Sequence, residues 1–99
     1  MIINGYETKT TFWEDFTIAD AFGVKAIKDT YKKAFDEWKE DYIYLTELVL
    51  VTNWKCWQHY AKGNTKISEL YGQLFHRSRN YALSHLKGAE FEYFFNTTD

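Results

Sequence analysis

The segment from Tyr42 to Tyr60 constrains the fold of this chain more than any other. Twelve of its nineteen residues are apolar or aromatic, and a helical repeat of 3.6 residues turns them to every side. A helix that is apolar all round lies at the centre of a bundle, or it meets a partner on a side that the bundle leaves uncovered. The pattern favours central burial, and both interpretations stay open for Tyr42, Tyr44, Trp54 and Trp57.

Three more segments have apolar residues at helical spacing. They are residues 11–22, 24–40 and 64–87. Together with the central segment they predict a single all-α domain over residues 1–99, with the architecture of a compact four-helix bundle. At the start of the first helix, Thr11 and Glu14 have the spacing of a capping box.

The two ends of the chain are less clearly patterned. The Asn4-Gly5 pair between apolar residues favours a tight hairpin, so residues 1–9 are expected to form a short ribbon or an extended arm. Residues 89–95 are expected to form a short C-terminal helix, although their alternation of aromatic and acidic residues also permits a strand.

The composition suits a domain that folds without a disulfide or a metal. Aromatic residues make up 20% of the chain, and each one removes roughly 150–250 Å² from water when buried. The single cysteine, Cys56, cannot form an intramolecular disulfide, and no secretory leader is recognisable. No more than four apolar residues follow one another in Tyr42–Tyr60, so no membrane span is expected. The sequence therefore predicts a cytoplasmic protein.

The candidates for catalysis are few. Cys56 and His59 are three residues apart on the central helix, the spacing of a thiolate–imidazole pair or of half a zinc site. No second cluster completes a metal site, and Cys56 between two tryptophans is expected to be buried and inert. His85 falls on the apolar stripe of the last long helix and is expected to be a core residue, with His76 on the opposite side. We therefore expect a protein that is not an enzyme and that holds no cofactor or metal.

Charge divides the chain into two halves and suggests two binding surfaces. Residues 1–50 carry ten acidic and six basic side chains, whereas residues 51–99 carry four and six. Acidic residues gather where the second helix meets the third, and with two aromatic neighbours they form the predicted protein-binding set of Asp36, Glu37, Glu40, Asp41, Tyr44 and Trp54. A basic stripe on the last long helix predicts the alternative, a nucleic-acid surface with Lys66, Arg77, Asn80 and Lys87.

Residues 11–23, 36–60 and 86–99 resemble a group of short proteins encoded on phages and conjugative elements of Gram-positive bacteria. The resemblance brings no catalytic residues with it. It implies a protein that counters host defences by binding, anti-CRISPR proteins being one class, with a nucleic-acid-handling enzyme as the partner. We therefore expect a non-enzymatic protein-binding module, an inhibitor of a host defence nuclease complex. The alternative is a small DNA- or RNA-binding accessory protein, and a homodimer that buries part of the central helix is also compatible with the pattern.

Overall fold

The computed structural model describes residues 1–98 and contains five helices and one two-stranded hairpin over that range. The elements in chain order are β1 (Ile2–Ile3), β2 (Tyr6–Glu7), α1 (Phe12–Asp20), α2 (Val24–Trp38), α3 (Tyr42–Ala61), α4 (Thr65–His85) and α5 (Ala89–Thr98). The prediction of an all-α bundle with a short N-terminal ribbon and a short C-terminal helix is confirmed. None of the helices in this part of the chain is long and apolar enough to cross a membrane.

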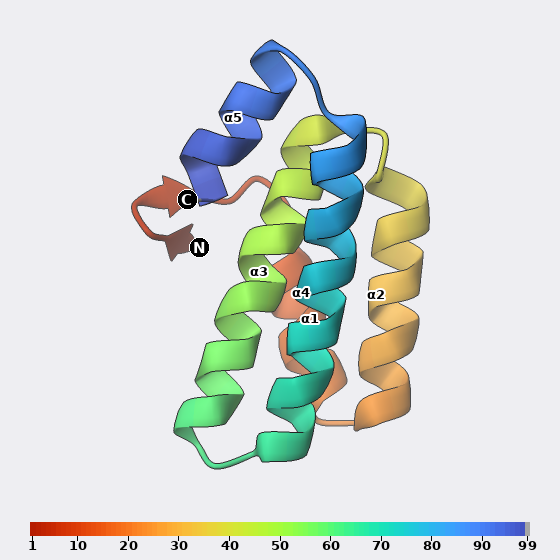
Figure 1. The fold of residues 1–99 in the computed structure, drawn as a ribbon. Coiled ribbons are helices and arrows are strands. Elements are labelled where there is room, and N and C mark those ends of the chain that lie inside the picture. The colour runs from red at the N-terminus through yellow and green to blue at the C-terminus, as the bar shows by residue number, and fades with distance from the viewer. Residues whose placement is uncertain (99) are drawn as a thin grey trace.

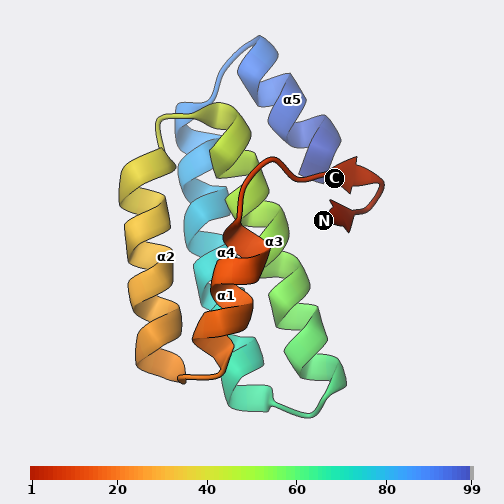
Figure 2. The same cartoon turned by 180° about the vertical axis from the view of Figure 1, so that it is seen from behind.

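The three long helices stand side by side, and the short elements close the bundle around them. In Figure 1, α3, α4 and α2 lie next to one another, with α1 behind them; Figure 2 shows α1 from the other side, between α2 and α3. The short helix α5 crosses one end of α3, and the hairpin lies beside α3 beneath α5. The first and last described residues therefore lie on the same side of the molecule.

Helix α3 is the centre of the core over its first half. Its eight consecutive residues from Leu45 to Thr52 are all buried, because α1, α2, α4, α5 and β1 all pack against it. Two large aromatic side chains, Phe16 and Tyr71, pack beside it and meet edge to face, at 5.6 Å between ring centroids. The apolar side chains of α3 thus pack against other elements on every side of the helix, but only along part of its length.

Local sequence signals set both ends of α3. The carboxylate of Asp41 accepts hydrogen bonds from the backbone N–H groups of Ile43 and Tyr44, at 3.0 and 3.1 Å, and so caps the first turn. At the other end, Gly63 takes a φ of +79°, and the N–H groups of Gly63 and Asn64 donate to carbonyls of the last turn. That pattern is a Schellman motif, which glycine favours because it has no Cβ.

The N-terminal ribbon follows from Asn4-Gly5. Both residues take positive φ, 51° and 78°, which is the conformation that a two-residue type I′ hairpin turn requires. Ile2 then pairs with Glu7 and Ile3 with Tyr6 in an antiparallel register. Since side chains alternate along a strand, Ile3 enters the core while Ile2 stays 66% exposed.

At the two short helices, one sequence-based expectation is wrong and one open alternative is excluded. Thr11 does precede α1, but no side-chain cap forms, and its hydroxyl donates to the carboxylate of Asp15 instead of forming a box with Glu14. The strand allowed for residues 89–95 is not formed either. These residues form a helix instead, in which Phe94 inserts between α3 and α4 and packs against Leu45 and Val49.

Candidate functional site

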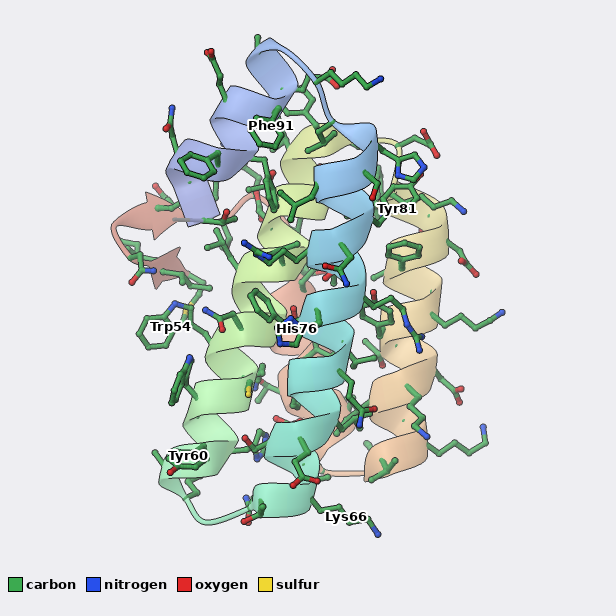
Figure 3. The ribbon with its side chains drawn as sticks, viewed as in Figure 1. Trp54, Tyr60, Lys66, His76, Tyr81 and Phe91 are labelled. Carbon is green, nitrogen blue, oxygen red and sulfur yellow. The ribbon has the colours of Figure 1, made fainter. Side chains whose placement is uncertain are left out.

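The second half of α3 carries an uncovered aromatic face. Trp54, Trp57 and Tyr60 follow one another at three-residue intervals, and they are 39%, 57% and 66% exposed. Trp57 and Tyr60 meet edge to face, with 5.8 Å between their ring centroids. In Figure 3, Trp54 and Tyr60 project away from the bundle on the side of α3 that faces neither α4 nor α2. We call these three residues the aromatic face.

The aromatic face exists because the elements that cover α3 stop short of its C-terminal half. The hairpin and α5 lie against the first half of α3, where Leu50 is 2% exposed. Further along the helix, no element of residues 1–98 packs on that side, as Figures 1 and 3 show. Applied to about 150–250 Å² per aromatic side chain, the three exposed fractions amount to roughly 300 Å² of aromatic surface.

Glu47 holds the N-terminal segment and α5, the elements that cover the first half of α3, in place. Its side chain is fully buried, and its carboxylate accepts hydrogen bonds from the backbone N–H groups of Lys9 (2.8 and 3.0 Å) and Thr10 (2.9 Å). It also accepts from the Tyr6 hydroxyl at 3.1 Å, and that hydroxyl lies 2.6 Å from the hydroxyl of Tyr93 on α5. One carboxylate therefore ties the N-terminal segment to α3, and through two tyrosines to α5.

A second buried polar cluster joins α1 to the second half of α3, the half that carries the aromatic face. The Lys55 ammonium is almost fully buried and donates to Asp20 at 3.1 Å, to Thr17 at 2.7 Å and to Gln58 at 3.3 Å. It also lies 4.4 Å from the centroid of the Trp13 ring. All three ammonium donors thus have acceptors, which is what allows a charged lysine to be buried.

Asp20 is the acceptor on which this cluster converges. Its carboxylate binds Lys55, the His59 ring at 3.0 Å through Nε2, and the Tyr71 hydroxyl in a short hydrogen bond. The other His59 nitrogen lies 3.3 Å from the Asn64 amide. Burial raises the pKa of Tyr71, and so does its hydrogen bond to Asp20. Every member has its partners, so the cluster is best understood as a structural clamp between helices.

Cys56 and His59 do not form a pair. The Cys56 thiol lies 3.5 Å from the Ser68 hydroxyl and faces α4, at the point where Gly72 brings the two helices close together. His59 turns instead to Asp20 and Asn64. Within residues 1–98, no three histidine, cysteine, aspartate or glutamate side chains are grouped so that they could hold a metal ion.

His85 is exposed, and its prediction as a core residue is wrong. The buried stripe of α4 ends at Ala82, one turn earlier, and beyond it Leu86 packs against the core in place of His85. The His85 ring stacks on Tyr81 at 3.9 Å between centroids, and its Nδ1 donates to the Tyr81 carbonyl. His76 is exposed on another side of α4, as predicted, and points toward the viewer in Figure 3.

The predicted acidic residues lie together at the junction of α2 and α3, and all four are exposed. Asp36 pairs with Lys32 at 3.7 Å, and Glu40 accepts a hydrogen bond from Tyr81 at 2.8 Å. Asp41 caps α3, and Glu37 lines a groove between α1 and α2.

Of the two predicted aromatic contacts, Tyr44 lies at that corner and lines the same groove as Glu37, whereas Trp54 does not. Tyr44 is half-buried and packs on Phe12 and on Trp38, at 6.4 and 4.4 Å between ring centroids. Trp54 is exposed but lies thirteen residues along α3 from Asp41, which is about 20 Å at 1.5 Å per residue. The structure therefore separates the acidic corner from the aromatic face. The apolar pattern leaves Trp57 open between burial and contact, and it gives no signal that marks Tyr60 as a contact.

The predicted basic stripe is exposed and lies on a different side of the molecule. Lys66, Arg77 and Asn80 project from α4, and Lys87 follows the end of that helix. Arg77 lines a groove between α4 and α2. Figure 3 shows Lys66 pointing away from Tyr60, so the stripe does not border the aromatic face.

Comparison of the chain with protein-family models, with curated proteins and with solved structures finds no match.

Proposed function

We propose that this chain is a non-enzymatic protein-binding module and that the aromatic face of α3 is its contact surface. The observation that carries the proposal is the exposure of Trp54, Trp57 and Tyr60 on one side of a single helix. Tryptophan and tyrosine are the residues most enriched among the energetic centres of protein interfaces. Their position on a rigid, well-packed helix means that little ordering entropy is lost when a partner binds.

The size of the face indicates a heterologous partner. Roughly 300 Å² of aromatic surface is less than the about 800 Å² that each side of a standard stable interface buries. The face therefore suits the anchor of a larger contact, in which a partner surrounds it with complementary polar groups. A self-complementary dimer would need most of its buried area from this face. We therefore favour a different protein over a second copy of the chain as the partner.

The separation of aromatic and basic groups argues for a protein over a nucleic acid. Single-strand binders place aromatic rings inside a positively charged groove, so that bases stack while the backbone is neutralised. Here Arg77 lines the groove between α4 and α2, and Lys66 points away from Tyr60. Direct binding of DNA or RNA is the alternative function, with binding that weakens as salt rises and on substitution of these side chains.

The test is capture of a partner with matched variants. The chain is immobilised and exposed to lysate of a Gram-positive bacterium, as wild type, as the double variant Trp57→Ser/Tyr60→Ser, and as Phe22→Ser. Phe22 is 78% exposed in the turn between α1 and α2, and Figures 1 and 2 show that turn on the other side of the bundle from the C-terminal half of α3. We expect one protein at stoichiometric amounts with wild type and with Phe22→Ser, and its loss with the double variant. Equal recovery by all three would refute the proposed surface.

We further propose, from the resemblance to mobile-element proteins, that the partner is a host defence nuclease complex. Glu37, Glu40 and Asp36 would then act as phosphate-like charges in a second contact, near the end of α3 opposite to the aromatic face. Charge reversal of these three residues to lysine should release the captured protein. Retention by the charge-reversed variant, together with loss by Trp57→Ser/Tyr60→Ser, would reject the acidic corner while leaving the aromatic face in place.

A further inference from the structure

The groove between α2 and α4 places exposed charged side chains beside the edge of the core, away from the aromatic face. It has a volume of about 510 Å³. Its apolar walls come from Tyr31 and Phe35 on α2 and from Leu70 and Leu74 on α4. Such a volume falls in the range of small-molecule sites, which pair an apolar lining with a few polar groups.

Tyr31 lines this groove and carries a buried hydroxyl without a partner. Tyr31 is 2% exposed, and its hydroxyl is the one buried side-chain polar atom of residues 1–98 that lacks a hydrogen-bond partner. The neighbouring Ser78 hydroxyl already donates hydrogen bonds to backbone carbonyls of α4, at 3.0 and 3.1 Å. Burial raises the pKa of Tyr31 to about 12 against the lowering effect of Ser78 and Arg77. The hydroxyl therefore keeps its proton and offers it to an acceptor that the chain itself does not supply.

The rim of the groove has uncompensated positive charge. Its two acidic residues are each paired within α2, Asp29 with Lys25 at 2.8 Å and Asp36 with Lys32 at 3.7 Å. Arg77 and Lys28 line the same groove, and within the described residues neither has an ion-pair partner. Arg77 is exposed, so its planar guanidinium can turn into the groove and bind an anion with two parallel hydrogen bonds.

We propose that this groove binds a small organic anion, with its phosphate or carboxylate on Arg77 and the Tyr31 hydroxyl and its apolar body against Phe35, Leu70 and Leu74. Gln73 lines the groove between them and is placed to donate to the same head group. The site lies on another side of the molecule from the aromatic face, so it stands or falls independently of the proposed function.

The test is a titration of the ¹⁵N-labelled protein at low ionic strength. Four probes separate the contributions: phenyl phosphate and benzoate carry a ring and a charge, benzyl alcohol carries the ring alone, and inorganic phosphate the charge alone. We expect at least one of the two ring-bearing anions to bind with shift changes at Tyr31, Gln73 and Arg77. We expect the neutral ring and the bare ion to bind at least about tenfold more weakly. The stronger of the two anions identifies the head group.

Variants test the two polar contacts. Arg77→Gln should weaken the stronger anion about tenfold or more, and Tyr31→Phe should weaken it severalfold. Tyr31→Phe keeps the fold, because the hydroxyl that it removes makes no hydrogen bond. Lys66→Gln, on the same helix but outside the groove, should bind as the wild type does. Absence of binding by both anions at about 10 mM, shift changes confined to other surfaces, or unchanged binding by both Arg77→Gln and Tyr31→Phe would overturn the proposal.

Discussion

At the scale of single residues, buried charges shape this molecule as much as its aromatic rings do. Lys55 and Glu47 interrupt the apolar run of α3 in the sequence, yet both are buried, at 1% and 0% exposure. Each is satisfied by groups far away in the chain, Lys55 by Thr17 and Asp20, and Glu47 by the backbone of Lys9 and Thr10. Periodicity cannot reveal such partners, because it describes only one helix at a time.

Removing the Lys55 charge should strongly destabilise the fold. Lys55→Met leaves the largely buried Asp20 carboxylate without its cation, and breaking a buried pair in this way costs about 3 kcal/mol. The double variant Lys55→Met/Asp20→Asn should recover part of that loss, since it removes the unpaired charge. Urea denaturation measures both free energies of unfolding. A loss below about 1 kcal/mol in the single variant would show that the clamp does not hold the helices together.

Alkaline pH should weaken the fold through its buried tyrosines. Burial raises the pKa of Tyr71, and it raises that of Tyr31 to about 12. In the unfolded chain both lose their protons near pH 10, while the folded chain keeps them, so the unfolded state binds fewer protons above that pH. The stability is therefore complete below pH 10 and is lost as pH rises toward 12, by about 1.4 kcal/mol per pH unit for each such group.

Urea denaturation at pH 9 and pH 11 measures this effect, and Tyr31→Phe is its matched control. The variant lacks one buried hydroxyl, so its stability should fall less steeply over the same interval. Equal slopes for the variant and the wild type would show that Tyr31 ionises in the folded state as readily as in the unfolded one.

At the scale of elements, the sequence pattern predicted where the helices lie well, but predicted poorly which parts of each helix other elements cover. Apolar spacing located α2 and α4, and the side chain of Asp41 marked the start of α3. The same spacing placed His85 in the core, because it does not show where a neighbouring helix ends. It also described Tyr42–Tyr60 as uniformly apolar, whereas the hairpin and α5 bury only the first half. Coverage depends on the lengths of other elements, which no local pattern contains.

The hairpin should depend on Glu47. Glu47→Gln keeps the size of the side chain but turns an amide toward backbone donors that need an acceptor, so we expect a loss of about 2 kcal/mol in stability. The amides of Lys9 and Thr10 should also exchange with solvent faster. Tyr93→Phe is the control, because it removes one hydroxyl beyond the carboxylate and leaves those amides bonded. Unchanged exchange at Lys9 and Thr10 in Glu47→Gln would contradict this role.

At the scale of the whole molecule, the two halves of α3 differ in how far other elements cover them. The first half of the helix holds the bundle together, and the second half presents Trp54, Trp57 and Tyr60 to the surroundings. The clamp of Asp20, Lys55 and His59 lies at the level of these rings on the opposite side of the same helix turns. It holds α3 rigid where the aromatic face is offered, which suits a preformed binding surface.

Site-specific photo-crosslinking in living cells tests this account most directly. A photoreactive phenylalanine analogue replaces Trp57 in one variant and Phe22 in another, and both are expressed in a Gram-positive bacterium. The account predicts one defined crosslinked protein from position 57, none from position 22, and loss of the adduct when Trp54 and Tyr60 are also changed to serine. The same diffuse pattern from both positions, or an adduct with a second copy of this chain alone, would contradict it.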